Sequence, residues 1–197
     1  IPGTVYTLGD NVYPNGTLRE FIDCFEPSWG RHKWRTRPAP GNHDYATPNA
    51  AGYFEYFGQA AGDEPGLGYY SYDFGAWHVI VLNSVRDRVR GSPMVDWLEQ
   101  DLAAHPARCT VAYWHHQRFS SGMLGNNASF QDLWEVLYEA HVDIVLNGHD
   151  HHYERFAPQT PNGQPDPAHG IREFIVGTGG RSLFPWGVVA DNSEVRS

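Results

Sequence analysis

The sequence predicts an α/β fold formed by one domain over residues 1–197. Short apolar runs typical of buried strands alternate along the chain with amphipathic stretches typical of helices. Hydrophobic residues make up 41% of the 197 residues, which is enough for a sizeable core without disulfide or metal staples. No internal repeat and no low-complexity linker divides the sequence.

The first elements place a carboxylate at the end of a strand. The apolar run Thr4–Leu8 predicts a buried strand, and Gly9–Pro14 is the loop that follows it. Asp10 would stand at the carboxyl end of this strand, where open α/β sheets bind ligands, although alone it is also typical of a turn. The spacing over Thr17–Phe25 predicts a helix, and the basic stretch Arg31–Arg37 predicts a solvated face.

A second glycine turn and a hairpin follow. Gly41–Asp44 presents an amide, an imidazole and a carboxylate in succession. Residues 48–68 are rich in Gly, Ala and aromatics and predict a loop over one edge of the site. Tyr69–Phe74 and Trp77–Asn83 predict a β-hairpin in which His78 is a structural histidine.

The second half repeats the pattern of helix and strand. Ser92 as N-cap and Pro93 as the first helical residue predict a helix that ends near His105. The strand predicted next, Cys109–Trp114, delivers His115 and His116 to its end. The remaining predicted elements are a substrate-contacting loop over 119–127, a helix over 130–138, and strands over 142–146 and 171–176.

The stretch Gly148–Arg155 follows the strand predicted at 142–146 and carries the densest set of metal-ligating side chains. His149 and His151 stand at i and i+2, so that in an extended chain they share one face. Two imidazoles beyond a strand end are typical of a metal site, although alone the stretch is also compatible with a polar loop.

Together the strand ends present carboxylate, amide and imidazole ligands, a mixture without cysteine that suits Zn²⁺, Mn²⁺ or iron. The residues are Asp10, Asn42, His115, His149 and His151. Asp10 has two oxygens and could bridge two ions about 3.5–4 Å apart, which would clamp a phosphoryl group and activate water. His43 would stay free of metal and could protonate the leaving oxygen or bind a phosphate oxygen, with Asp44 orienting its imidazole.

Charge and composition exclude several partners. The net charge of −9 argues against a nucleic-acid or anionic-membrane binder, but bound cations would still admit a phosphate ester. No apolar run approaches about 18 residues, so no membrane span is expected. We expect a secreted or periplasmic protein. Cys24 and Cys109 fit no metal motif, and we expect two buried thiols or one disulfide; the oligomeric state is left open.

These motifs resemble, in order, those of the calcineurin-like metallophosphoesterases, and Tyr13 with the run His151–Arg155 resembles the purple acid phosphatase branch. The motifs are Gly9-Asp10 with Tyr13, Gly41–Asp44, Val111–His115 and Gly148–His151. The resemblance implies a β-sandwich flanked by helices in four layers (αββα), with a dinuclear metal centre at the strand ends.

Carried over residue by residue, the resemblance implies that Asp10 bridges the two ions. One site would be completed by Asn42, His115 and His149, and the other would contain Tyr13 and His151. The two ions would be an iron together with zinc, manganese or a second iron. His43 matches the family's catalytic histidine. His116 adjoins a ligand and is a candidate for substrate binding, although strand alternation would turn it away from the metals.

The activity that the resemblance implies is acid phosphatase-like hydrolysis of phosphomonoesters by a metal-activated hydroxide. The alternatives are a phosphodiesterase or nucleotidase on the same centre, a Ser/Thr protein phosphatase, and a non-catalytic metal- or phosphate-binding module. The family places a further metal-binding aspartate on a strand before Asp10, and its sheet continues past Ser197. We therefore expect a domain that is truncated at both ends and, through its weakened second metal site, a poor enzyme.

Overall fold

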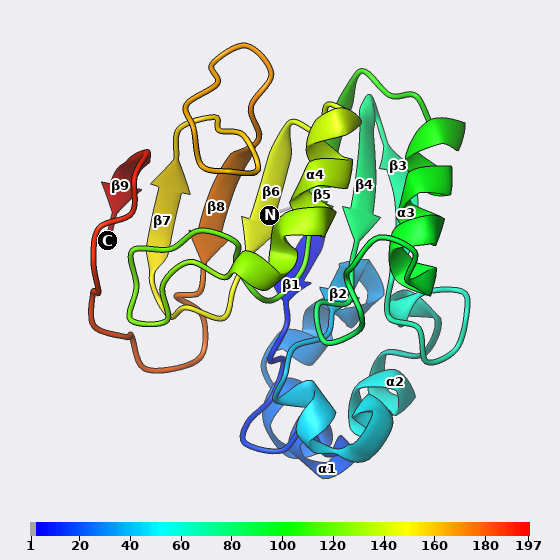
Figure 1. Cartoon of the computed structure of the whole chain (residues 1–197). Coiled ribbons are helices and arrows are strands. Elements are labelled where there is room, and N and C mark those ends of the chain that lie inside the picture. The colour runs from blue at the N-terminus through cyan, green and yellow to red at the C-terminus, as the bar shows by residue number, and fades with distance from the viewer. Residues whose placement is uncertain (1–2) are drawn as a thin grey trace.

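The computed structural model describes residues 3–197, which form two β-sheets with helices packed around them (Figure 1). The smaller sheet pairs β1 (Val5–Leu8) in parallel with β2 (Thr36–Ala39). The larger one has the order β3-β4-β5-β6-β8-β7-β9 within these residues. Its strands are β3 Tyr70–Phe74, β4 Trp77–Val81, β5 Cys109–Tyr113, β6 Ile144–Asn147, β7 Tyr153–Phe156, β8 Arg172–Val176 and β9 Ser193–Arg196. The run β4-β5-β6-β8 is parallel throughout.

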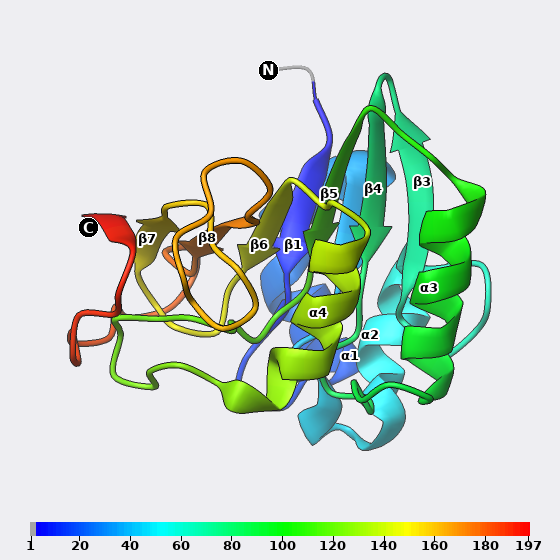
Figure 2. The same cartoon turned by 45° about the horizontal axis from the view of Figure 1, so that its top comes forward.

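The large sheet is covered on both faces because successive residues of its strands point apolar side chains to opposite faces. Val79 and Val81 of β4 enter a core between the two sheets, whereas Ile80 enters the core beneath the helices. Helices α3 (Pro93–Ala104) and α4 (Gln131–Glu139) cover the second face, as Figures 1 and 2 show. The predicted α/β sandwich flanked by helices is confirmed.

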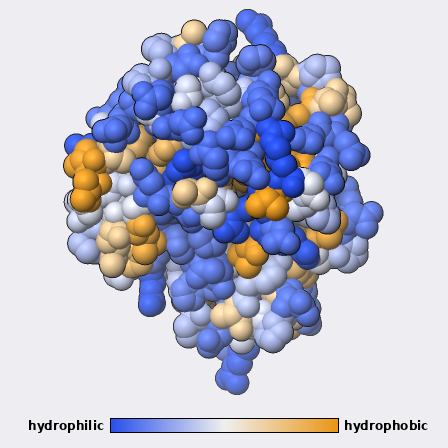
Figure 3. All heavy atoms as spheres, in the orientation of Figure 1, coloured by the Kyte–Doolittle hydropathy of each residue, from blue (hydrophilic) through white to orange (hydrophobic). Residues whose placement is uncertain are grey.

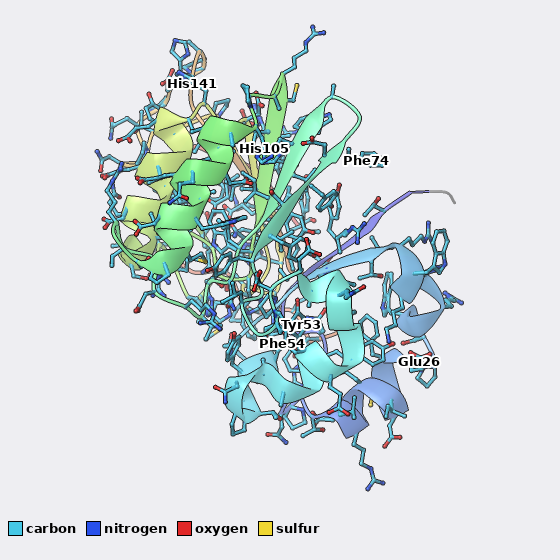
Figure 4. The ribbon with its side chains drawn as sticks, turned by 90° about the vertical axis from the view of Figure 1, so that its right-hand side faces the viewer. Glu26, Tyr53, Phe54, Phe74, His105 and His141 are labelled. Carbon is cyan, nitrogen blue, oxygen red and sulfur yellow. The ribbon has the colours of Figure 1, made fainter. Side chains whose placement is uncertain are left out.

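The N-terminal helices form a third core next to the small sheet. α1 (Leu18–Glu20) begins at Thr17 with a capping box and continues as a π-turn over Phe21–Phe25, close to the predicted helix. α2 (Ala51–Phe57) packs Tyr53 and its neighbours against it, and the Tyr53 hydroxyl donates to Pro38 O of β2 at 3.0 Å (Figure 4).

One prediction for this region was wrong, and one strand was not predicted. Residues 48–68 are not a loop, because they contain α2 and two 3₁₀ turns, Pro48–Ala50 and Gly58–Ala61. Tyr53, Tyr56 and Phe57 recur at helical spacing and are all buried, a signal that the Gly and Ala content obscured. The basic stretch is partly exposed, but it ends in β2, whose Arg and Pro residues disfavour a strand prediction.

Both cysteines are free thiols. Cys24 is an exposed free thiol and Cys109 a partly buried one, so the prediction of two buried thiols was wrong for Cys24 and no disulfide joins them. Among residues 3–197 there is no helix with the length and apolar character needed to cross a membrane. Figure 3 shows a mostly hydrophilic face on which apolar residues lie in small groups.

Candidate metal centre

The loop after β1 brings Asp10 close to the loop after β2. Asp10 has a positive φ of 51°, and its Oδ1 accepts the backbone N–H of His43 at 2.8 Å. Gly9 and Gly41 permit this approach, since a Cβ on Gly9 would collide with the His115 ring and one on Gly41 with Asp10. The two glycine turns that flank the predicted ligands therefore have a steric role.

Three possible metal-ligating atoms lie around Nε2 of His115. Its Nδ1–H donates to Leu8 O at 2.7 Å, which directs Nε2 into the centre. This Nε2 lies 3.0 Å from Asn42 Oδ1, 3.0 Å from His149 Nδ1 and 3.3 Å from Asp10 Oδ2. One nitrogen carries at most one proton and cannot satisfy three such neighbours, whereas a metal ion among these nitrogen and oxygen donors would.

Tyr13 and His151 lie on the other side of Asp10. The Tyr13 hydroxyl donates to Asp10 Oδ2 at 3.1 Å and is 3.4 Å from His151 Nε2. His151 Nδ1–H donates to Ser182 O at 2.9 Å, and its ring stacks on Phe184 at 3.9 Å between centroids. The structure thus brings all six predicted ligands together, with Asp10 between two sets.

The protonation states favour metal binding. Burial alone would raise the pKa of Asp10, but the hydrogen bond and charge of His115 lower it well below its usual range. Burial, together with the charge of His115, lowers the pKa of His149 to about 4. At neutral pH Asp10 is therefore ionised and His149 neutral, the forms that bind cations. Burial opposes a charge on His115, but the hydrogen bond and charge of Asp10 raise its pKa, so a cation bound there would replace a proton.

The side chains of His149 and His151 are placed by a turn after β6, and not by the alternation of side chains along a strand. β6 ends at Asn147, and the chain then turns through His149, whose φ is 61°. The Asn147 side chain holds this turn by donating to Trp114 O at 3.1 Å and to His116 O at 3.2 Å. The two rings approach from a turn, so the argument from a shared strand face was wrong.

His43 and Asp44 are adjacent in sequence but have separate contacts. His43 Nδ1–H donates to Pro14 O at 2.7 Å, and its ring lies 4.6 Å from that of Tyr13. The buried Asp44 accepts the Gly41 N–H at 2.8 Å and also groups of Asn11, so the prediction that it orients the His43 imidazole was wrong. Asp44 instead ties the two ligand-bearing loops together, and burial raises its pKa to about 7.

His116 faces the centre rather than away from it. Its ring lies 4.2 Å from that of His149, and with His115 and His149 it forms a cluster of possible metal ligands. β5 has already ended at Tyr113, so strand alternation no longer applies at His116 and the expectation built on it was wrong. Ser84, whose Oγ is 2.8 Å from His116 Nδ1, was missed, although it follows β4 at the same edge of the sheet.

A cavity of about 370 Å³ lies beside the centre and gives access to it. Its lining includes Asp10, Tyr13, His115, His149 and His151, with β1 and residues 176–180 as further walls. His116 does not line this cavity, but burial and the charge of His115 lower the pKa of His116 to about 2. Both histidines next to His115 are therefore uncharged at neutral pH.

A buried carboxylate supports the loop beyond His116. Glu173 of β8 is fully buried and accepts the backbone N–H groups of Arg118 at 3.0 Å and Phe119 at 3.2 Å. Burial raises the pKa of Glu173 to about 8. The start of the predicted substrate-contacting loop is thus anchored to the large sheet.

We expect Glu173→Gln to change the free energy of unfolding, relative to wild type, more favourably at pH 8 than at pH 5. The folded-state pKa is about 8 and the unfolded one is near 4.5, so the folded chain holds the proton more tightly. Wild-type stability should therefore fall between about pH 4.5 and 8, by a few kcal/mol at about 1.36 kcal/mol per pKa unit. Urea unfolding of variant and wild type at both pH values measures this effect, and Glu64→Gln, at an exposed glutamate, is the control. If the free energies of unfolding of Glu173→Gln and wild type differ by the same amount at both pH values, the prediction is wrong.

Comparisons with known proteins agree with this geometry. Purple acid phosphatase 23 of Arabidopsis thaliana is 32% identical over 163 residues, covering 73% of this chain and 35% of that protein. Probable inactive purple acid phosphatase 1 of the same plant is 26% identical over 221 residues, covering 91% and 35%. The chain thus spans about a third of the length of these curated relatives.

The fold is shared with a solved structure. Purple acid phosphatase PPD1 from yellow lupin (Lupinus luteus) seeds superposes with a TM-score of 0.75 at 18% identity, over 98% of this chain and 40% of that one. A model of the calcineurin-like phosphoesterase family matches residues 2–153, well over half of the 197 residues. The chain therefore belongs to the calcineurin-like phosphoesterase family.

Proposed function

We propose that this chain forms a single catalytic domain that hydrolyses phosphate monoesters at a centre for two metal ions. The observation that carries the proposal is the position of Asp10, whose Oδ2 faces His115 at 3.3 Å and Tyr13 at 3.1 Å. Asn42, His115 and His149 would hold one ion, and Tyr13 with His151 the other, with Asp10 shared. Such ions, when bound, polarise the phosphoryl group and lower the pKa of water towards about 7.

The remaining residues position the substrate and move a proton. His43 commits its Nδ1–H to Pro14 O, which leaves Nε2 to carry the proton for the leaving oxygen. The Ser84 hydroxyl accepts the backbone N–H of His116 at 3.2 Å and can donate to its Nδ1. This places the ring proton of His116 on Nε2, which then donates to a phosphate oxygen.

Metal analysis combined with an aryl phosphate assay tests the proposal. We expect about two transition-metal ions per chain and hydrolysis that a chelator abolishes and added metal restores. Hydrolysis that resists chelation would contradict the role of the metals. Comparing an aryl monoester with the matching diester then separates a phosphatase from a phosphodiesterase.

A non-catalytic metal- or phosphate-binding module is the second candidate. It is favoured by two relatives, each 26% identical to this chain, whose names describe them as probable inactive purple acid phosphatases. Retention of both ions without hydrolysis of any phosphate ester would support this candidate. A secreted or periplasmic location stays a prediction.

We expect Tyr13→Phe to remove a visible charge-transfer absorption from the oxidised, iron-loaded protein. Burial and the nearby charge of Asp10 raise the pKa of Tyr13 without a metal, so phenolate character would have to come from a bound Fe³⁺. The measurement is the visible spectrum together with the iron content. Tyr45→Phe, which alters a partly buried tyrosine that bonds Asn83, should keep the band. A colourless wild-type protein with full iron occupancy would rule the ligand role out.

A further inference from the structure

A second group of metal-ligating side chains lies in the α3–β4 contact. His78 of β4 is 1% exposed, and its Nε2 is 2.8 Å from Oδ2 of the buried Asp101 on α3. His105 follows Asp101 by one helical turn, and its Nδ1 is 3.2 Å from Asp101 Oδ1. One candidate ligand atom from each residue lies within 4.8 Å of the others.

The cluster has its own supporting contacts. Asp73 Oδ1 accepts from His78 Nδ1 at 2.8 Å, which leaves Nε2 directed at Asp101. Ser71 Oγ donates to Asp101 Oδ1 at 2.7 Å and fixes the carboxylate. A carboxylate on the far nitrogen of a histidine is the usual partner of a metal-binding imidazole, because it orients the ring and raises its basicity.

Spacing and charge both fit a small divalent cation. Two atoms bonded to one Zn²⁺ at about 2.0–2.2 Å with tetrahedral angles lie about 3.3–3.6 Å apart. The observed 2.8 and 3.2 Å join the two histidines to different oxygens of Asp101, and the two rings stack with 11° between their planes. Binding one ion therefore needs His105 to rotate and release its 2.9 Å contact with Asp101 O, which its half-exposed side chain at the end of α3 permits. Asp73 and Asp101 bring two carboxylates to two imidazoles, so a divalent ion would balance the charge.

This cluster is separate from the phosphoesterase centre. His78 is paired with Thr110 at the start of β5, whereas His115 lies beyond the end of that strand. His105 also lines a surface depression of about 720 Å³, through which an ion could enter. Figure 4 shows His105 at the end of α3 and His141 at the same end of the molecule.

We propose that His78, Asp101 and His105 form a structural binding site for Zn²⁺ or a similar divalent transition metal, with water as the remaining ligand. The ion would pin the C-terminal end of α3 to the β3–β4 hairpin. The competing arrangement is a proton in place of the metal, with His78 as an imidazolium between Asp73 and Asp101.

The test compares zinc content in the full chain carrying His105→Asn or His141→Asn. His141 lines the same depression but lies outside the cluster, and asparagine tolerates its positive φ of 57°. After zinc loading and gel filtration, His105→Asn should hold one zinc per chain fewer than wild type, and His141→Asn the same number. A zinc excess of about 100 times Kd should raise the Tm of wild type by about 5–10 °C more than that of His105→Asn.

Equal zinc content in wild type and His105→Asn would overturn the proposal, as would a loss confined to His141→Asn. Unchanged aryl phosphatase activity in both variants would show that neither substitution disturbs the fold or the catalytic centre. Should the chain hold no catalytic metals at all, the expected difference of one zinc remains, so the two proposals fail separately.

Discussion

Asp10→Asn should release both metal ions of the phosphoesterase centre and lower kcat at least about 10³-fold. The asparagine keeps an oxygen for the His43 N–H and tolerates the φ of 51°, so the loop should stay in place. What it removes is the negative charge between the two ligand sets. Lewis-acid stabilisation by such ions is worth several kcal/mol, and about 1.36 kcal/mol corresponds to a factor of ten in rate.

Metal content by mass spectrometry and single-turnover rates with an aryl phosphate would measure both effects. Asp191→Asn, at an exposed aspartate far from the centre in sequence, provides the matched control. If Asp10→Asn keeps two tightly held ions, Asp10 is not the bridging ligand. A loss of one ion would assign Asp10 to a single site.

His43→Ala should lower kcat by about 10²–10⁴ while leaving metal content unchanged, the range typical of a lost general acid. The reason is geometric, because the His43 side chain donates its Nδ1–H to Pro14 O. The bond from His43 to Asp10 is made by the backbone N–H, which alanine keeps. The loss should be smaller for aryl phosphates with acidic leaving groups, which need little protonation.

The diagnostic measurement is the slope of log kcat against leaving-group pKa for wild type and variant. A steeper slope in His43→Ala supports proton donation. Parallel lines would mean that His43 only positions the phosphate. Falling metal content in the variant would instead make His43 part of the metal site.

The ligand positions could be predicted because they depend on a simple rule. Apolar runs identify the strands, parallel strands bring their carboxyl ends to one edge, and Asp10 and His115 follow directly after such strands. The prediction required no knowledge of turn geometry. The rule named Asp10, Asn42, His115, His149 and His151, and the structure brings these five side chains together, although the reason given for His149 and His151 was wrong. Tyr13 was expected from the family resemblance alone, and the role of all these residues as ligands stays a prediction.

Contacts made beyond the strand ends could not be predicted in the same way. The orientation of His116 depends on a turn and on Ser84, which is 32 residues away in sequence. Asp44 bonds Asn11 across a sequence separation of 33 residues, and nothing local indicates that partner. Such contacts arise from the packing of loops, for which hydrophobic periodicity carries no information.

The left-handed backbone at Asp10 and His149 has a consequence for how this sequence can evolve. Each non-glycine residue held in that region costs about 1–3 kcal/mol, which the surrounding turns must offset. Glycine at either position would relieve the strain while abolishing a ligand, and neither side chain belongs to the three hydrophobic cores. At Asp10 that gain is set against the loss of the acceptor for the His43 N–H and the Tyr13 hydroxyl, so hydrogen bonds rather than core packing oppose the substitution.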